Sequence, residues 1–427
     1  MIGLDSSMPP PAEPPAPAGE QQGPDQASYL STVWAQLKKN RISLWGVWCI
    51  GALVILAIFA PVISLNQPFY FSADGVTRFP FLRSLFNRLL FENSVDIFFN
   101  LALVLLPLYL AIVLGARKRW GASFTRLKLR LLLGLAVGHV ILASSMLPAS
   151  MFGVNNPLFF TEKVENYAAR AAEYDAQGKS YTAVFPLRRF GYRDTDPEHS
   201  VAPPSGRHWL GTDYEGRDVF ARMLYGTRIS LTIGIVAVAI YVSIGIVLGA
   251  LAGYYGRWVD NWISRLIEVM ICFPSFFLIL TIAALIEKRS IFHVMLIIGF
   301  TGWTGVARLI RAEFLKQTSL DYVQAARALG LSERRIIFRH ILPNAVAPVL
   351  VSATFGIAAA ILIESSLAFL GVGDPSVASW GETLNTGRTE HKLWLVLAPG
   401  FAIFFVVSVF NLVGEGLRDA LDPRLRR

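Results

Sequence analysis

The apolar residues of this chain fall in long, nearly unbroken blocks rather than in the short periodic patterns of soluble helices and strands. A helix needs about 20 mostly apolar residues to cross the hydrocarbon core of a bilayer. Lipid offers no partner to an unpaired backbone group, so such segments must be helical. Eight stretches approximately qualify: 44–65, 97–115, 131–150, 229–253, 263–286, 291–309, 345–368 and 393–414. The pattern predicts an all-α, polytopic membrane protein with about eight spans.

The polar segments between the blocks predict the orientation. Segment 116–130 carries six basic residues and no acidic one, and segment 310–343 is also strongly basic. Basic residues also precede the first block and end the chain. Basic loops stay on the cytoplasmic side, and with eight spans all four regions share one side, so we expect both termini in the cytoplasm. Lys288 and Arg289, in a short predicted outer hairpin, run against this pattern.

The composition supports a membrane protein without a nucleic-acid partner. Of the 427 residues, 54% are hydrophobic and 16% are charged, against about 25% charged residues in soluble domains. The net charge of +9 and the pI of about 9.6 fit the excess of Lys and Arg in cytoplasmic loops. Cys49 and Cys272 both lie in apolar segments, which excludes a disulfide framework or a cysteine-based metal site.

Three longer polar segments interrupt the apolar pattern. Residues 1–43 begin with a proline-rich stretch without an apolar core, so we expect a disordered cytoplasmic tail and juxtamembrane segment rather than a signal peptide. Residues 66–94 predict a moderate outer loop. Residues 151–225 predict a much longer outer segment with a helix-like run at 161–177, and its part 151–205 is polar enough for an extracytoplasmic module.

The most informative segment is 320–344, LDYVQAARALGLSERRIIFRHILPN, on the basic side between two predicted spans. Its first part has a helix-forming composition, and Gly330 is expected to end that helix as a C-terminal cap. Ser332 is expected to begin a second helix that runs to Pro343. Small side chains at Ala325 and Ala326 would let a partner surface approach closely. The alternative is an ordinary basic connector.

The spacing Ala-Ala-x3-Gly-x10-Ile-Leu-Pro within this segment resembles the signature loop of the permease subunits of ATP-driven (ABC) importers. In that family the loop forms the coupling helix that docks on the ATPase. The resemblance implies an ATPase-coupling role for Asp321, Gln324, Ala325, Ala326, Leu329, Gly330, Leu342 and Pro343. The chain departs from the pattern at Gln324, where the family has glutamate, and at His340, where it has isoleucine.

Further stretches resemble the C-type subunits of the dipeptide/oligopeptide/nickel permeases. They are HWLGTDYEGRDVFARMLYGTRISLTIG (208–234), RLIEVMICFPSFFLIL (265–280), SLAFLGVGDPSVASWGETL (366–384) and the final GEGLRDALDPRLRR. The resemblance covers about residues 205–427 and the first span. It implies a type I importer transmembrane domain over 206–427. Such subunits usually have six spans, so those at 97–115 and 131–150 look like two extra spans inserted within 66–205.

The resemblance implies a transporter subunit that is not an enzyme. It would translocate peptides or peptide-like solutes across the bacterial cytoplasmic (inner) membrane by alternating access. Its implied partners are two ATP-binding subunits, a homologous permease subunit in a heterodimer, an extracytoplasmic solute-binding protein and membrane lipid. ATP and magnesium would be bound by the partner ATPase, and this chain would bind no cofactor or metal. The sequence agrees, because Gly178-Lys179-Ser180 matches only the tail of a phosphate-binding loop and Glu173 replaces its first glycine.

Ionisable residues within or near the spans are candidates for function, because charge is costly in a bilayer. Glu268 follows Arg265 by three residues, so a helical ion pair is the favoured explanation there. Glu364, beside Ser365, either lines the translocation path or pairs at an interface, and the sequence leaves both open.

The inserted spans and the entry to the core carry further polar groups. Asp96 is expected at an interface, and His139 in a hydrogen bond within the bundle. Segment 208–218, HWLGTDYEGRD, is expected to form a structured turn around Asp213. A gate and a contact with the binding protein are the alternatives for this segment.

Two other classes of function predict features that we do not find in the sequence. A secondary transporter or channel would place ion-binding polar residues in mid-span and would have no partner-docking loop. A membrane-embedded enzyme or assembly factor would need a cluster of acid, base or nucleophilic side chains. Peptides are the substrate class that the resemblance favours; nickel chelates, peptide antibiotics and sugar or opine conjugates stay open. We expect the two inserted spans to anchor the outer module against the binding protein.

Overall fold

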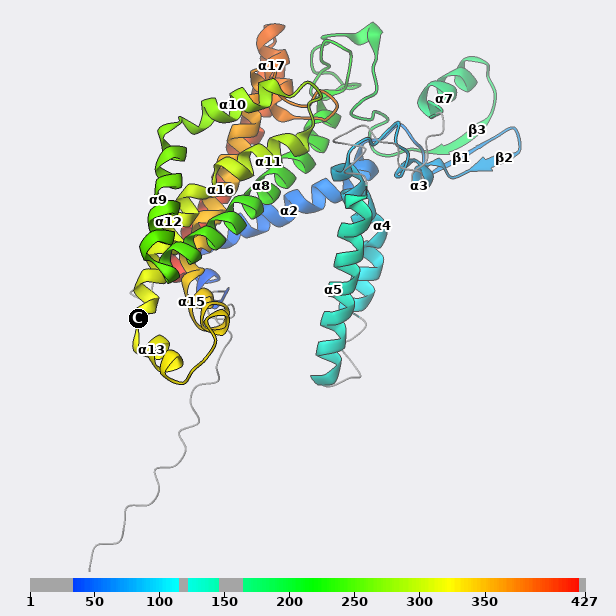
Figure 1. The fold of residues 1–427 in the computed structure, drawn as a ribbon. Coiled ribbons are helices and arrows are strands. Elements are labelled where there is room, and N and C mark those ends of the chain that lie inside the picture. Colours follow the sequence, from blue (N-terminus) through cyan, green and yellow to red (C-terminus); the bar gives the residue numbers. More distant parts are fainter. Residues whose placement is uncertain (1–33, 115–121, 146–163, 422–427) are drawn as a thin grey trace, which may run out of the picture.

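The computed structural model describes residues 34–114, 122–145 and 164–421, and this part of the chain is mainly helical (Figure 1). The main bundle and its loop contain α2 (Arg41–Ile63), α8 (Val219–Tyr255), α9 (Arg257–Cys272), α10 (Ser275–Leu285), α11 (Ile291–Thr301), α12 (Trp303–Thr318), α13 (Asp321–Ala328), α14 (Glu333–Arg335), the π-helix η2 (Ile336–Ile341), α15 (Leu342–Ala345), α16 (Ala347–Phe369), α17 (Trp380–Thr389) and α18 (Leu393–Leu421). The remaining helices are α3 (Pro80–Ser84), α4 (Ser94–Leu114), α5 (Ala122–Ser144), α7 (Tyr167–Ala176) and the 3-10 turn η1 (Pro197–His199). We call the end of the bundle near α17 the outer end and the opposite end, with α13, the loop end (Figure 1).

Helix α8 is the centre of the bundle and packs against α2, α11, α12 and α16. Gly245, Gly249 and Gly253 lie one turn apart on α8 and face α12. A Cβ atom at Gly249 would lie 2.5 Å from the carbonyl oxygen of Ala307. Small residues at four-residue intervals let membrane helices approach closely, so this stripe sets the distance between α8 and α12.

Six helices of the described residues are long and apolar enough to cross a membrane, or up to seven if the bent pair α9–α10 is one span, where the sequence predicts about eight. The segment expected as a span over 263–286 is not one continuous helix, because α9 and α10 meet at a bend of 79°. Pro274 has no N–H, and its ring pushes Phe273 into extended backbone. The span expected at 291–309 is longer than predicted, since α11 and α12 together reach Thr318.

Each of the other expected spans overlaps one helix that has different ends. The first span, 44–65, lies in α2, which begins at Arg41, and residues 1–33 of the expected tail lie outside the described residues. The span 229–253 is the later part of α8, which begins at Val219. The spans 345–368 and 393–414 correspond to α16 and to most of α18. The first turns of α8 extend beyond the apolar block because their polar side chains are buried among partners, as described below.

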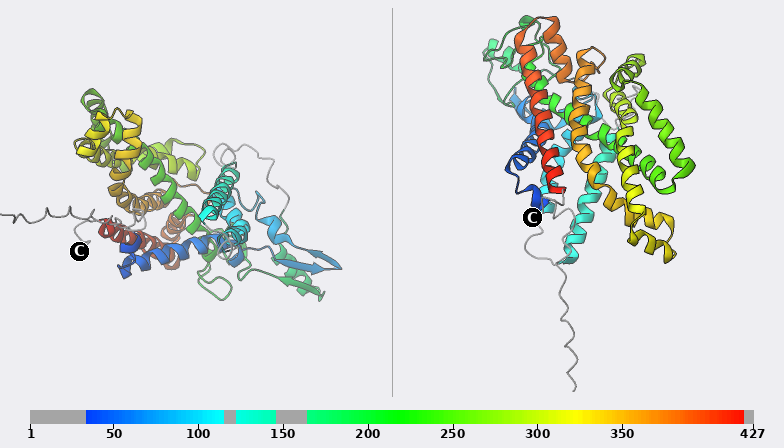
Figure 2. Two further views of the ribbon diagram at one scale, coloured as in Figure 1. Left: turned by 90° about the horizontal axis from the view of Figure 1, so that it is seen from below. Right: turned by 90° about the vertical axis from the view of Figure 1, so that its left-hand side faces the viewer.

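Helices α4 and α5 form a hairpin beside the bundle, and α4 contacts α2 and α8 (Figures 1 and 2). Helix α4 corresponds to the expected inserted span 97–115 and is one of the six, whereas α5, at the place of the expected span 131–150, is not among them. Residues 115 and 146–150 of these expected spans lie outside the described residues. Helix α5 begins at Ala122, within the segment expected to be a loop. The basic residues in this part of α5 are compatible with a helix, because long basic side chains can direct their charged ends away from apolar surroundings. Lys128 donates a hydrogen bond of 2.7 Å from its side chain to the Val113 carbonyl at the end of α4.

We call residues 64–93 and 164–218 the outer region. It contains a small β-sheet that the sequence did not predict. Strand β1 (Tyr70–Ala73) lies between β2 (Val76–Arg78) and β3 (Tyr181–Val184), and both pairings are antiparallel, with Phe71 opposite Arg78 and Ala183. Phe71 packs with Tyr167 and Tyr174 of α7. The module therefore combines the first outer loop with the later segment, rather than being confined to 151–205. Its helix-like run is helical from Tyr167 onward.

Candidate functional site

The loop end of the bundle carries the segment 320–345, in which the first helix stops at a glycine as predicted. Gly330 has a φ of +72°, which glycine adopts without steric cost. Its N–H donates to the Arg327 carbonyl at 2.9 Å, and the N–H of Leu331 donates to the Ala326 carbonyl at 3.2 Å. These two bonds are those of a Schellman motif. They fix the angle at which the chain leaves α13.

The second helix of this segment is longer and less regular than predicted. It starts after Ser332, whose side chain makes no capping hydrogen bond, and it continues as the π-helix η2. It does not end at Pro343 but runs to Ala345, because proline occupies the first turn of α15, where a missing N–H costs little. The wider turn of η2 appears in the bond from the Leu342 N–H to the Ile337 carbonyl.

The loop segment has a buried face and an exposed face. Val323 and Ala326 of α13 are buried in the same apolar cluster as Ile336 and Ile341 of η2. Of the predicted coupling residues, Ala326 is therefore buried and Leu342 is half-buried. The exposed ones are Asp321, Gln324, Ala325, Leu329, Gly330 and Pro343.

Side chains at the exposed face are apolar as well as polar. Leu329 is 81% exposed and Phe338 is 62% exposed, and Tyr322 is also exposed. Gln324, the departure from the family pattern, donates from its side-chain amide to the Thr318 carbonyl at 2.8 Å, so it binds the end of α12. Exposed apolar side chains on a loop otherwise rich in charge are typical of a protein interaction surface.

Two contacts join the loop segment to the end of α8 that lies at the loop end of the bundle. The Tyr255 hydroxyl donates to Glu333 at 3.2 Å. The Arg327 guanidinium lies 5.3 Å from the centre of the Tyr254 ring, a cation–π contact. A displacement of this loop would therefore act on the central helix of the bundle.

At the outer end of α16, Glu364 is buried and bound to the start of α17. The Ser379 hydroxyl donates to Glu364 at 2.8 Å, and the Ser365 hydroxyl lies 3.4 Å from the same carboxylate. Ser379 also caps α17 by accepting the Gly381 N–H. Both Glu364 and Ser365 are buried within the chain in this structure, and their contribution to a translocation path stays a prediction.

The predicted turn around Asp213 is present and belongs to a larger buried network. Asp213 accepts the backbone N–H groups of Glu215 and Arg217 and the Arg217 side chain at 2.7 Å. Arg222, in the first turns of α8, donates to Glu382 of α17 at 2.8 Å. Burial raises the pKa of Glu382, and Arg222 only partly offsets it. The sequence indicated the turn but not its partner in α17, which lies far along the chain.

A second network of this kind joins α4 to the bundle, and the sequence did not single out its central residue, Arg228. This side chain is fully buried in α8, donates to the Ala57 carbonyl of α2 at 2.8 Å and pairs with Asp96 of α4 at 3.1 Å. The Tyr192 hydroxyl donates to the other oxygen of Asp96 at 3.0 Å. Asp96 thus lies at an interface, as expected, between the inserted hairpin, the bundle and the outer region.

Two smaller predictions, the ion pair of Glu268 and the hydrogen bond of His139, are confirmed. Arg265 and Glu268 form an exposed ion pair at 2.5 Å. His139 is hydrogen-bonded within the hairpin, since its Nε2 lies 2.8 Å from the Phe98 carbonyl oxygen. Gly178 lies in the turn that follows α7, where its φ of +64° serves the chain reversal into β3.

The outer end of the bundle carries a cavity of about 660 Å³. Glu382, Asn385 and Glu390 line it from the side of α17, and Lys288 and Arg289 from the turn after α10. The Arg289 guanidinium donates to the Gly371 carbonyl at 2.6 Å. The two basic residues that run against the charge pattern therefore border a pocket with acidic side chains.

Comparisons with known families identify two matching regions. Residues 245–427 match the model of the binding-protein-dependent transport system inner membrane component. Residues 28–79 match the N-terminal membrane domain of oligopeptide transport permease C. Neither family model covers residues 80–244, which hold the α4–α5 hairpin, most of the outer region and most of α8.

Three relatives are similar to about half of this chain. The dipeptide transport system permease protein DppC of Alkalihalophilus pseudofirmus is 42% identical over 243 residues, which cover 56% of this chain and 80% of the relative. The glutathione transport system permease protein GsiD of Pectobacterium atrosepticum is 41% identical over 226 residues, 52% of this chain and 75% of the relative. The oligopeptide transport system permease protein OppC of Bacillus subtilis is 36% identical over 242 residues, 56% of this chain and 79% of the relative.

Proposed function

The chain belongs to the peptide-transport permeases among the binding-protein-dependent inner membrane components, and from this premise we propose that it moves peptides or peptide-like solutes by alternating access, driven by a separate ATPase. It is a multi-pass protein of the inner membrane, and its relatives are transporter subunits rather than enzymes. The proposed partners are two ATP-binding subunits, a homologous permease subunit and an extracytoplasmic solute-binding protein. ATP and magnesium would bind to the ATPase partner rather than to this chain.

The observation that carries this proposal is the loop 320–344. Its helix α13 is held rigidly by the Schellman motif and by the burial of Val323 and Ala326, while Leu329 and Ala325 face outward. A rigid helix with an exposed apolar side chain suits a groove on a partner. Because the loop contacts Tyr254 and Tyr255 at the end of α8, closure of the ATPase pair would pull on the bundle's central helix.

The substrate class also belongs to this proposal. The relatives are named for dipeptide, glutathione and oligopeptide transport. The cavity at the outer end is lined by both acidic and basic side chains, the groups that would accept the two charged ends of a short peptide as it leaves the binding protein. A solute shifts the balance between two conformations only through different affinities for them.

The test uses Leu329→Asp, because this side chain is exposed and its replacement should leave the fold intact. The tagged chain is purified from detergent-solubilised membranes that also contain the other subunits. We expect the variant to lose the ATPase and uptake of labelled peptide, since a charge would enter an apolar contact. Leu187→Asp, at a similarly exposed leucine of the outer region, is the matched control and should retain both.

Two results would count against the proposal. If the ATPase co-purifies with Leu329→Asp in the wild-type ratio and uptake is unchanged, the loop is not the docking element. If the wild-type chain purifies without any ATP-binding subunit, the coupled-importer mechanism fails for this chain. Ala326→Asp and Gly330→Pro are harsher variants of the same loop, because the first buries a charge and the second cannot adopt a φ of +72°.

A further inference from the structure

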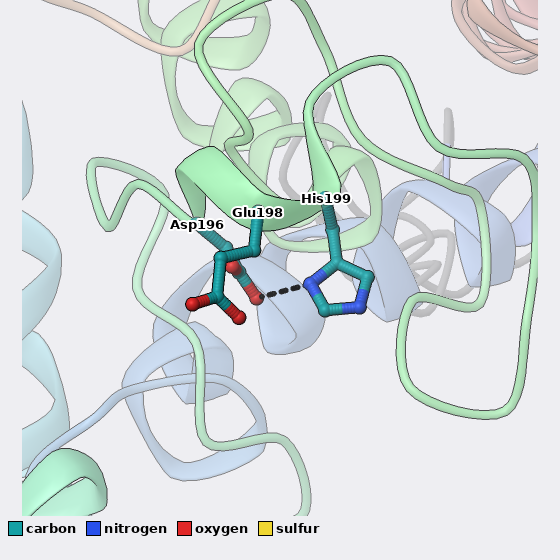
Figure 3. Close-up of side chains that lie close together, drawn as sticks. All are labelled: Asp196, Glu198 and His199. Carbon is teal, nitrogen blue, oxygen red and sulfur yellow. Dashed lines mark hydrogen bonds and ion pairs between the residues drawn. The ribbon is translucent and has the colours of Figure 1, made fainter.

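The outer region holds a cluster of two carboxylates and two imidazoles that the transport mechanism does not use. Asp196, Glu198 and His199 lie in and next to the short turn η1, and their ligand atoms all lie within 4.8 Å of one another (Figure 3). His208 approaches from the segment that precedes α8, with its Nε2 atom 3.7 Å from Asp196. We call these four residues the outer histidine cluster.

His208 is the independent sign of a ligand. Its side chain is only 1% exposed, and its Nε2 has no hydrogen-bond partner among the described residues. Its other ring nitrogen, Nδ1, lies 2.8 Å from the carboxylate of Asp218. A carboxylate at Nδ1 keeps the proton there, so Nε2 presents a lone pair. A buried imidazole of this kind, fixed by a carboxylate and directed at an acidic group, is the usual arrangement of a histidine that binds zinc.

The distances from Asp196 to the two imidazoles are close to those around a tetrahedral ion. Bonds of about 2.0–2.1 Å to nitrogen and oxygen place neighbouring ligand atoms of a tetrahedral zinc site roughly 3.3–3.4 Å apart. Asp196 Oδ2 lies 3.1 Å from His199 Nδ1 and 3.7 Å from His208 Nε2. These two distances bracket the required one, whereas the His199 and His208 rings, whose centres lie 6.0 Å apart, and Glu198 would have to turn toward a shared ion.

The outer histidine cluster also has a competitor for the metal, which is Arg207. Its guanidinium lies 2.8 Å from the same oxygen of Asp196, and its side chain is 58% exposed. An exposed guanidinium can leave this oxygen at little cost, because water replaces its contact.

We propose that Asp196, Glu198, His199 and His208 form a binding site for one divalent transition-metal ion of the zinc class. Two imidazole nitrogens and two carboxylate oxygens make a four-coordinate site. Imidazoles select zinc, nickel or copper over calcium and magnesium, which prefer oxygen ligands. The ion would join η1 to the start of α8 and so fix the outer region on the bundle. The site does not depend on docking of the ATPase at the opposite end.

The experiment uses the complete transporter, purified with a tag that contains no histidine and stripped of metal by a chelator. Zinc affinity is measured by competition with a fluorescent zinc indicator. Cobalt is then added in place of zinc, since its visible absorption distinguishes four-coordinate from six-coordinate sites. The variants are His199→Ala and Glu198→Gln, at partly or fully exposed positions that should not disturb folding, together with Arg207→Gln. His391→Asn removes an exposed histidine elsewhere and is the matched control.

We expect wild type to bind one zinc ion per chain and to give a four-coordinate cobalt spectrum. His199→Ala and Glu198→Gln should weaken zinc binding by at least about tenfold, and Arg207→Gln should tighten it or leave it unchanged. His391→Asn should equal wild type. The proposal is overturned if wild type retains no zinc against the indicator, or if His199→Ala binds zinc as wild type does. It is also overturned if Arg207→Gln weakens binding as much as the ligand variants, because the cluster would then be a structural ion network.

Discussion

The bundle and the outer region of this protein are held together by different means. In the bundle, α8 and α12 approach through a stripe of glycines and share a large apolar cluster. The outer region and the α4–α5 hairpin have smaller apolar clusters and depend on buried polar pairs: Arg228 of the bundle with Asp96 of the hairpin, and Tyr192 of the outer region with the same Asp96. Apolar packing spreads its stabilisation over many side chains. A buried polar pair concentrates its stabilisation in two side chains. A single substitution should therefore destabilise the outer region more than the bundle.

The largest effect is expected at Arg228. Arg228→Met leaves Asp96 buried without its cation, which typically costs about 3–5 kcal/mol when one partner of a buried pair is removed. The hairpin should lose its contact with α8 and become sensitive to protease in detergent, while the bundle stays resistant. Thermal unfolding of the purified complex gives the loss of stability.

The double variant Arg228→Met with Asp96→Leu is the control for this prediction. Replacing both partners removes the uncompensated charge, so most of the lost stability should return. If the double variant is as unstable as the single one, the apolar contacts around the pair, and not its charges, hold the hairpin. The contrast between the two regions would then disappear.

The next effect tests the bundle. At Gly249→Ala, a Cβ atom would lie 2.5 Å from the Ala307 carbonyl oxygen, and overpacking of this kind costs about 1–3 kcal/mol. Gly51→Ala is the matched control in α2, where no atom lies within 4 Å of the added Cβ and helix propensity should leave stability equal or slightly higher. Equal effects of the two substitutions on thermal unfolding would show that the glycine stripe does not set the helix distance.

The sequence predicted the bundle better than the outer region, and the reason is physical. A membrane span is decided by about 20 consecutive residues, so α2, α8, α16 and α18 could be found from local sequence. The break between α9 and α10 was missed because Phe273-Pro274 lies inside an apolar block whose length alone fits a span. Strand β1, by contrast, pairs with β3 across more than a hundred intervening residues, and no local pattern specifies that partner.

The candidate sites divide in the same way. The Schellman motif at Gly330 is local, so its position followed from one glycine and its neighbours. The polar networks depend on residues far apart in the chain, such as Arg228 and Asp96, and only the fold brings them together. The outer histidine cluster had a weak local signal, Asp-Pro-Glu-His followed by His208, which the resemblance to permeases did not draw attention to.

A pH effect should separate the outer region from the bundle. Burial raises the pKa of Asp194 to about 6 from 3.8, against the opposing hydrogen bond from the Gly191 N–H. The folded state therefore binds this proton more tightly than the unfolded state, and stability should fall as pH rises from about 4 to above 6. The change is on the order of 2 kcal/mol.

This prediction is measured by denaturant unfolding of the complex at several pH values, with Asp194→Asn compared at each pH. The difference between wild type and the variant should depend on pH only within that window. A difference that is constant from about pH 4 to above pH 6 would show that Asp194 is not held in a desolvated position.

The smallest effect is the sharpest test of whether the two regions unfold separately. Asn166 caps α7 by accepting the Ala169 N–H at 3.0 Å, and Asn40 caps α2 by accepting the N–H groups of Ile42 and Ser43. Loss of such a cap costs about 1 kcal/mol, which corresponds to roughly a fivefold faster opening. In Asn166→Ala, amide hydrogen exchange should therefore accelerate about fivefold in α7, while α12 is unchanged. In Asn40→Ala the effect should be confined to the first turn of α2, because apolar packing holds the rest of that helix. If α12 also exchanges faster in Asn166→Ala, the outer region and the bundle open together. The polar contacts between the two regions would then make them a single unfolding unit.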